Sequence, residues 1–170
     1  MSRFSRIVML AAAALGVAAA QTKVGIVNSQ KAMVDTAELK KAQLDMEAKY
    51  KPRIDQMTAI QKDLAALQAQ LQSGKLNPQQ QQDATAQGQR KERDLQRIQQ
   101  DVQEEQDRDR NDILGRILGR MREVVSKLAE AKGLDVVIDA ANTFYFKPAL
   151  DLTAEATAAY DKAYPAAPPK

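Results

Sequence analysis

The feature that most constrains this 170-residue chain is a long, charged, Gln-rich stretch that lies between two short β-branched runs. The stretch extends from about Thr36 to Lys132, and its apolar residues have helical spacing. The flanking runs are Lys23–Asn28 (KVGIVN) and Leu134–Ala140 (LDVVIDA). We therefore predict an α+β protein in which a long antiparallel helical hairpin leaves a small sheet and returns to it. This arrangement favours a grasping or spacing device over an enzyme.

The apolar spacing predicts a coiled-coil seam between the two helices of the hairpin. From Met57 to Leu71, apolar residues recur in steps of three and four. The segment 73–78 contains Gly74, which suits a left-handed helix end, and Asn77 and Pro78, which suit the start of a new helix. We predict a turn at this segment. The predicted seam comprises Tyr50, Ile54, Met57, Ile60, Leu64, Leu67, Leu71, Leu95, Ile98 and Val102.

Folding the helices back about this turn predicts which residues face each other. The numbers of facing residues should sum to about 152. This register pairs apolar residues, such as Tyr50 with Val102, and brings Lys49 close to Gln103. At a rise of about 1.5 Å per residue, arms of this length should project roughly 55 to 80 Å from the rest of the chain.

The predicted seam has a polar interruption. Residues 103–112 include no apolar side chain, and Pro52 lies close to the residues expected to face them. Because proline in a helix removes a hydrogen bond and costs about 3 kcal/mol, one interpretation is a compliant hinge at Pro52. The other interpretation is that the charged run is a solvated face and that Pro52 causes a mild kink.

Two features of the second helix are candidate contact sites. Gly115 and Gly119 are one turn apart and predict a close backbone approach near the base of the hairpin. The densest basic cluster lies nearer the tip and consists of Arg90, Lys91, Arg93 and Arg97. It predicts a weak contact with an anionic lipid headgroup, and ordinary pairing of charges along the helix surface is the alternative.

The rest of the chain is too small to fold alone. Strands are predicted at 24–27, 134–139 and 143–146, followed by a helix from Ala154 to about Lys162. About 60 residues with three short strands leave a marginal core and open sheet edges, so we expect neighbouring copies to complete the body. The residues expected in this shared body are Val24, Ile26, Val136, Val137 and Ile138.

The N-terminus is typical of a signal peptide. Arg3 and Arg6 precede an apolar run that ends in small residues, so cleavage after Ala20 and export are predicted. The run is too short to span a membrane. The predicted parts of the chain are the signal peptide (1–20), the first strand of the body (21–35), the helical hairpin (36–132), the remaining strands and C-terminal helix of the body (133–163) and a disordered tail (164–170).

Composition excludes several classes of site. The chain has no Cys and no His, which removes disulfides, thiol chemistry and the commonest general base and metal ligand. Aromatic residues make up 4% of the chain, too few for a surface that stacks single-stranded nucleic acid. After residue 20 the chain carries 23 basic and 22 acidic residues, so net charge does not favour a polyanion. We predict no catalytic residue, cofactor or metal site, and no nucleic-acid partner.

Three segments lie in a particular order around the hairpin: the run 23–28, the run 134–140 and the segment from Asn142 to Thr153. In these segments the chain resembles the Skp (OmpH-like) family of periplasmic chaperones. The resemblance implies a jellyfish-shaped homotrimer, in which three copies build one β body and three hairpins enclose a cavity. It also implies ATP-independent holding of unfolded outer-membrane β-barrel proteins in the periplasm.

Lipopolysaccharide contact, attributed to some relatives, is expected to be weak, because residues 36–132 carry 18 basic and 16 acidic side chains. Two other functional classes remain open. One is a structural envelope spacer whose coiled coil links two layers. The other is an adaptor that binds one folded partner.

Overall fold

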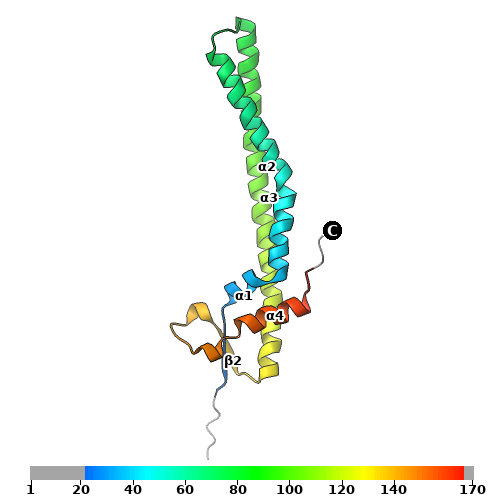
Figure 1. The fold of residues 1–170 in the computed structure, drawn as a ribbon, viewed down its shortest axis with the longest axis vertical. Helices are drawn as coiled ribbons and strands as arrows, with labels where there is room; N and C mark the ends of the chain where they lie inside the picture. Colours follow the sequence, from blue (N-terminus) through cyan, green and yellow to red (C-terminus); the bar gives the residue numbers. More distant parts are fainter. Residues whose placement is uncertain (1–21, 167–170) are drawn as a thin grey trace, which may run out of the picture.

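The computed structural model describes residues 22–166. The predicted signal peptide, residues 1–20, and the last four residues of the predicted tail lie outside the described residues. The described chain has a small body from which a long antiparallel helical hairpin projects (Figure 1). The predicted α+β class with a protruding helical hairpin is confirmed.

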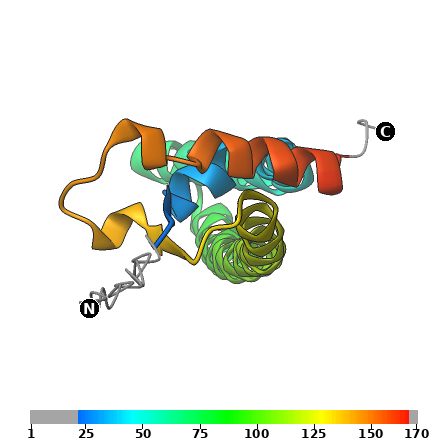
Figure 2. The same ribbon diagram turned by 90° about the horizontal axis from the view of Figure 1, so that it is seen from below.

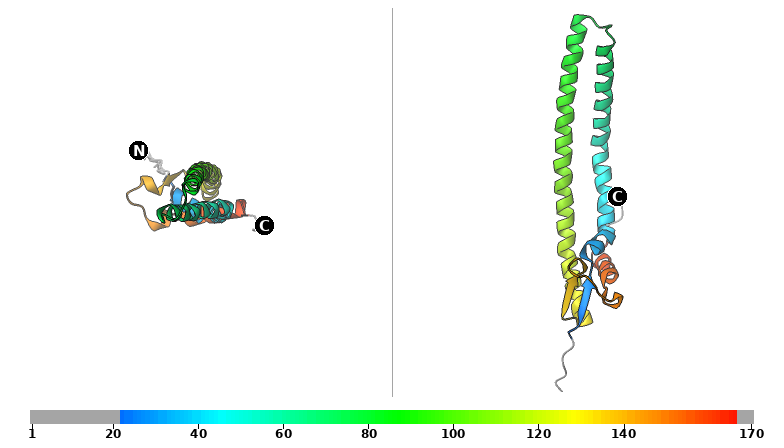
Figure 3. Two further views of the ribbon diagram at one scale, coloured as in Figure 1. Left: turned by 90° about the horizontal axis from the view of Figure 1, so that it is seen from above. Right: turned by 90° about the vertical axis from the view of Figure 1, so that its left-hand side faces the viewer.

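The hairpin is formed by α2 (Ala37–Gln72) and α3 (Pro78–Lys132), which extend together from the body to the tip (Figure 3). α2 starts directly after α1 (Ser29–Asp35), because Thr36 leaves the helical conformation and caps the next helix through its hydroxyl. α3 is 55 residues long and continues from the arm into the body. It ends at Gly133, which has a left-handed φ of 60°.

The turn between the arms is built from local side-chain contacts. α2 ends at Ser73, and Gly74 follows with a φ of 66°, a conformation that suits glycine. The side chain of Asn77 accepts a hydrogen bond from the backbone amide of Gln80 (2.8 Å), and the side chain of Gln80 accepts one from the amide of Asn77 (3.0 Å). Pro78 is the first helical residue, so nearby residues alone fix the start of α3.

The body contains a two-stranded parallel sheet, β1 (Val24–Val27) and β2 (Val136–Asp139), which pair from Val24 opposite Val136 onward. α4 (Thr153–Ala163) packs beside α1 and the lower part of α3 (Figure 2). The core between these elements consists of Val27, Ala32, Leu39, Ile117, Met121, Val124, Leu152, Ala156 and Tyr160.

The predicted third strand at 143–146 is wrong. This segment has no regular secondary structure and lies between two short 3-10 helices, Ala140–Asn142 and Pro148–Leu150. The carboxylate of Asp139 accepts a backbone amide hydrogen bond (2.9 Å) and caps the first 3-10 helix. Pro148 fixes the start of the second. Because the chain turns at both ends of the segment, it cannot continue beside β2.

The sequence prediction also missed α1. Its residues, Ser29–Asp35, were expected to follow the first strand without a helix of their own. The side chain of Asn28 accepts a hydrogen bond from the backbone amide of Lys31 (2.8 Å), which is the N-cap arrangement that starts a helix. An asparagine directly after a β-branched run was therefore the signal for this helix.

The arms face each other in a different register from the one predicted for mid-hairpin. Lys49 forms an ion pair with Asp109, which lies six residues beyond the predicted Gln103. Arg53 pairs with Glu105 (2.8 Å) in the same shifted register. The prediction relied on apolar matches between the helices. This part of α3 offers no apolar side chain, so polar contacts align the arms instead.

Gly115 and Gly119 do not make the close helix contact that the sequence suggested. A Cβ atom added at either position would meet no atom within 4 Å. Gly25 in β1 differs, since an added Cβ would lie 2.7 Å from Cδ1 of Leu152 and 2.8 Å from Cδ1 of Leu134. The close approach therefore occurs in the sheet and not in the helix.

We expect Gly119→Ala to raise the free energy of unfolding by about 1 kcal/mol, because alanine favours the helix and space is available. Gly25→Ala should lower it by about 1 to 3 kcal/mol, because the added methyl group overpacks the core. Urea denaturation followed by circular dichroism measures both changes. A less stable Gly119→Ala variant would show that another surface approaches this side of α3.

Candidate functional site

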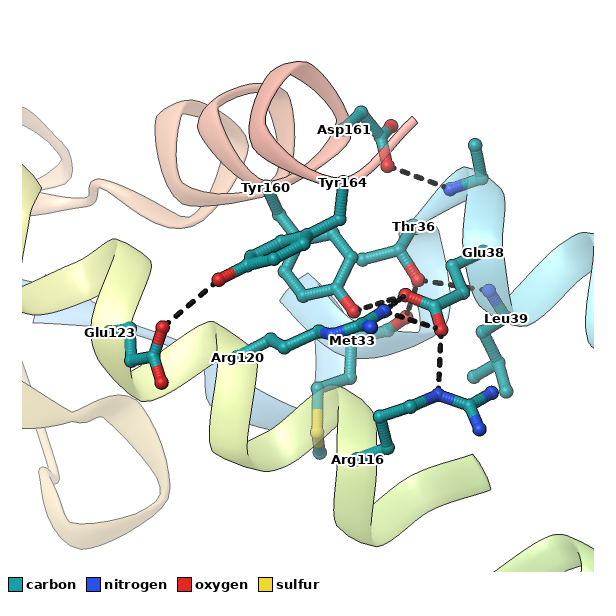
Figure 4. A network of polar contacts seen from close by, with 11 residues as sticks. Met33, Thr36, Glu38, Leu39, Arg116, Arg120, Glu123, Tyr160, Asp161 and Tyr164 are labelled. Carbon is teal, nitrogen blue, oxygen red and sulfur yellow. Dashed lines mark hydrogen bonds and ion pairs between the residues drawn. The ribbon is translucent and has the colours of Figure 1, made fainter. Parts of the chain in front are cut away.

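One carboxylate fastens the arms to the body. Glu38, in the first turn of α2, accepts hydrogen bonds from Nε of Arg116 (3.0 Å) and Nη1 of Arg120 (2.9 and 3.0 Å) on α3. The hydroxyl of Tyr160 on α4 donates to the same carboxylate (2.5 Å). Asp161, also on α4, accepts the backbone amide at the start of α2 (2.9 Å). Figure 4 shows these side chains converging from three helices, and we call Glu38, Arg116, Arg120 and Tyr160 the junction.

Tyr164 extends the junction along α3. Its ring centroid lies 4.7 Å from Cζ of Arg120 and 5.2 Å from the ring centroid of Tyr160. Its hydroxyl donates a hydrogen bond to Glu123 (2.9 Å). The predicted disordered tail, 164–170, is therefore wrong at its first residue, because three side-chain contacts hold Tyr164 in place.

The junction shifts the pKa values of its two acidic groups in opposite directions. Burial raises the pKa of the Glu38 carboxyl, but the hydrogen bonds from Tyr160 and the two arginines outweigh it, so this pKa is lower than usual. Burial, followed by the hydrogen bond to Glu38, raises the pKa of Tyr160 to about 12. At neutral pH a carboxylate therefore faces a neutral phenol, and all the hydrogen bonds of the junction are formed.

The junction was not predicted from the sequence. Two signals were present: Arg116 and Arg120 are one helical turn apart, and so are Tyr160 and Tyr164 in a chain that is only 4% aromatic. Neither pair of residues indicates which distant side chain it contacts. Glu38 lies 78 residues from Arg116 in the sequence, so only the folded hairpin brings them together.

The predicted seam residues differ in burial. Tyr50, Leu67 and Val102 are buried. Those that are half-buried are Met57, Ile60, Leu64, Leu71, Leu95 and Ile98. Ile54 is wrong as a seam residue, because it is 46% exposed. At this level of the hairpin the preceding residue, Arg53, joins the arms through an ion pair.

Pro52, the candidate hinge, lies inside α2, and the helix continues on both sides of it. Its side chain is exposed. Proline still removes one backbone hydrogen bond from the helix. A bend at this position therefore breaks fewer backbone hydrogen bonds than a bend elsewhere in α2. The hinge remains a prediction.

The predicted anion-contact cluster is partly engaged in ion pairs. Lys91 pairs with Asp63 across the hairpin (2.7 Å), and Arg97 pairs within α3 (3.3 Å). Arg90 and Arg93 are exposed. Both charge pairing and a weak contact with anions are compatible with this arrangement.

The body has an apolar surface that its own chain leaves uncovered. Phe144 is fully exposed, Tyr145 is 79% exposed, and Val136 and Ile138 of β2 are each more than a third exposed. Among the described residues, β2 has a strand partner on one edge only. A groove of about 560 Å³ with a largely apolar lining lies between β2 and the lower part of α3. Three other residues were predicted to lie in the shared body. Ile26 is buried within this chain, and Val24 and Val137 are partly buried.

Residues 22–166 contain neither a candidate membrane span nor a candidate metal site. None of their helices combines the length and the apolar character needed to cross a membrane. No three or more acidic, His or Cys side chains gather there as a metal site. The candidate functional site is the exposed surface of the arms together with the uncovered surface of the body.

Comparison with known proteins identifies relatives over nearly the whole described chain. A model of the family described as "Outer membrane protein (OmpH-like)" matches residues 23–160. A "Skp-like protein" from Pseudomonas aeruginosa is 26% identical over 157 residues, covering 90% of this chain and 94% of that protein. A crystal structure described as a putative outer membrane chaperone (OmpH-like) from Caulobacter crescentus has the same fold, with a TM-score of 0.67. It is 20% identical and covers 89% of this chain and 90% of that chain.

We expect the junction to make stability depend on pH in acid. The folded-state pKa of Glu38 is lowered, so its contribution is complete above the unfolded carboxyl pKa and is lost as pH falls through the folded pKa. Glu38→Gln should lower the free energy of unfolding at neutral pH by about 1 to 3 kcal/mol. It should also lose less stability than the wild type between about pH 6 and pH 3.

Urea denaturation at the two pH values measures both effects. Glu92→Gln, which changes an exposed residue of α3, is the control and should behave as the wild type. If Glu38→Gln loses as much stability in acid as the wild type, the junction does not cause the pH dependence.

Proposed function

The chain belongs to the OmpH-like outer membrane protein family, and we propose that it is an ATP-independent periplasmic holdase. The proposed clients are unfolded outer-membrane β-barrel proteins, which it keeps from aggregating between export and membrane insertion. The predicted signal peptide supports a periplasmic location. The names of the relatives, "Skp-like protein" and "putative outer membrane chaperone", support a chaperone role.

The exposure of the arms is the observation that carries this proposal. Outside the body, the buried apolar residues of the hairpin are Tyr50, Leu67, Ala84 and Val102. Most of the surface of the arms is therefore available to a client. An unfolded β-barrel protein exposes alternating apolar residues and unpaired strand edges. Many weak contacts along such arms would hold it without fixing its structure, and release would need no nucleotide.

The uncovered body surface supports assembly into a homotrimer. The open edge of β2, with Val136 and Ile138, and the exposed Phe144 and Tyr145 would be covered if neighbouring copies completed the body. A shared body would hold three arms around one cavity. A client inside that cavity would be separated from other unfolded chains.

The basic cluster near the tip supports a secondary proposal. Arg90 and Arg93 are exposed, so a weak contact with anionic lipid headgroups or lipopolysaccharide is retained. Residues 36–132 carry almost equal numbers of basic and acidic side chains, so this contact should be weak. Because it joins exposed charges, it should weaken further with added salt.

The central test mixes the chain from residue 21 onward with a urea-denatured outer-membrane β-barrel protein, diluted into buffer. We expect a soluble complex of three chains with one client, measured by light scattering coupled to size exclusion. A trimer that lets the client precipitate would favour the envelope spacer. Binding to a single folded protein but to no unfolded client would favour the adaptor.

The shared body is tested by the double variant Val136→Lys and Ile138→Lys. Two charges on the open edge of β2 should prevent assembly, because they would be buried without partners. We expect a helical monomer by sedimentation and by circular dichroism. The control is Arg90→Lys together with Arg93→Lys on the arm, which should remain a trimer. An assembled Val136→Lys/Ile138→Lys variant would contradict the proposed interface.

A further inference from the structure

The middle of each arm is held by very little packing. In α3, which is fully described, no residue between Val102 and Ile117 is buried. In α2, also fully described, Tyr50 is the single buried residue between Leu39 and Leu67. Farther out, Met57, Ile60 and Leu64 of α2 are half-buried in the seam, but opposite the polar residues 103–112 of α3 the one buried side chain of α2 is Tyr50.

Tyr50 makes a specific contact with the opposite arm. The residue is 2% exposed, and its hydroxyl donates a hydrogen bond to Oδ2 of Asp109 (2.7 Å). Nζ of Lys49 binds the same oxygen (2.5 Å) and lies 5.1 Å from the centroid of the Tyr50 ring. The hydrogen bonds from Lys49 and then Tyr50 lower the pKa of the Asp109 carboxyl, so it accepts both bonds as a carboxylate.

The nearest other contact between the two helices is a weaker type of interaction, an exposed ion pair. Arg53 and Glu105 form an ion pair whose side chains are 44% and 32% exposed, so water and salt screen it. Pro52 lies between Tyr50 and Arg53 and weakens the backbone hydrogen bonding of α2 at the same level. The buried phenol is therefore the contact that distinguishes a closed mid-arm from an open one.

We propose that Tyr50 and Asp109 form a lock that holds the two helices of each arm together at mid-length and limits how far the arm bows around a client. This role rests on the holding activity proposed above. There the lock limits the size of the client that the arms can enclose. Breaking it leaves exposed ion pairs to hold this part of the arm. A groove of about 290 Å³ lies beside the lock, and its lining includes Met46, Tyr50 and Ile54 together with charged and polar side chains. Opening of the arm would expose more of these three side chains to a client.

Hydrogen exchange of the assembled chain from residue 21 onward, measured by mass spectrometry without client, tests the lock directly. Tyr50→Phe keeps the ring and removes only the hydroxyl. We expect amides in 103–112 to exchange about tenfold faster than in the wild type, with little change in 117–128, which packs in the body. Asp109→Asn keeps a hydrogen-bond acceptor for Tyr50 but loses the charge. Its exchange rate in 103–112 should lie between those of the wild type and Tyr50→Phe.

Two matched variants serve as controls. Arg53→Gln removes the exposed ion pair nearby and should change exchange by less than about twofold. Tyr145→Phe removes a hydroxyl from an exposed residue of the body and should have no effect in the arm. The lock is refuted if Tyr50→Phe matches Tyr145→Phe in 103–112. It is also refuted if Tyr50→Phe speeds exchange equally in 117–128, because Tyr50 would then support the whole fold.

Client size is tested separately with denatured β-barrel proteins of about 8 and about 16 strands at limiting amounts of the chaperone. Tyr50→Phe should raise the soluble fraction of the larger client and leave the smaller one unchanged. Faster exchange with unchanged client capacity would overturn the assignment of the lock to client size. Failure of the wild type to hold either client would instead count against the proposed function.

Discussion

The architecture depends on one helix, α3, that belongs to the arm and to the body at once. Its last turns bury Ile117, Met121 and Val124 in the core of the body, and the rest of it forms one side of the arm. A helix changes direction only where its backbone hydrogen bonds are disturbed, so packing in the body fixes the direction of the arm. α2 lacks this continuity because Thr36 separates it from α1. The junction around Glu38 fastens α2 to α3 and α4 instead.

Contacts between the two helices of the arm are weaker at mid-length than at the base. At the base, a partly buried carboxylate receives several charge-assisted or phenolic hydrogen bonds, which are among the stronger polar contacts in proteins. At mid-length, exposed ion pairs worth about 0 to 1 kcal/mol each accompany the single buried ring of Tyr50. An arm that is held firmly at its base and more loosely at mid-length suits the proposed holding of unfolded chains of different size. This difference between base and mid-length would be unexpected in a rigid spacer.

The errors of sequence interpretation have specific causes. Lys49 was predicted to face Gln103 because apolar residues elsewhere in the hairpin match in that register. Lys49 contacts Asp109 instead, since the polar stretch of α3 has no apolar side chains that would fix the register there. The strand at 143–146 had suitable residues, but a β-strand needs a neighbour, and the chain turns away at Pro148. Tyr164 was assigned to a disordered tail because proline and alanine follow it. Its contacts with Arg120 and Glu123 come from a distant helix.

The sequence by itself determined the features that depend on near neighbours. The helical periodicity and the capping residues Asn77, Pro78 and Gly133 require only residues a few positions away, so the hairpin and its turn were predictable. Tertiary structure alone decided the junction of Glu38 with Tyr160, the register of the arms and the exposure of the body surface. These features join residues far apart in the sequence, and charged side chains accept many partners. Only packing of the apolar core brings particular ones within hydrogen-bonding distance.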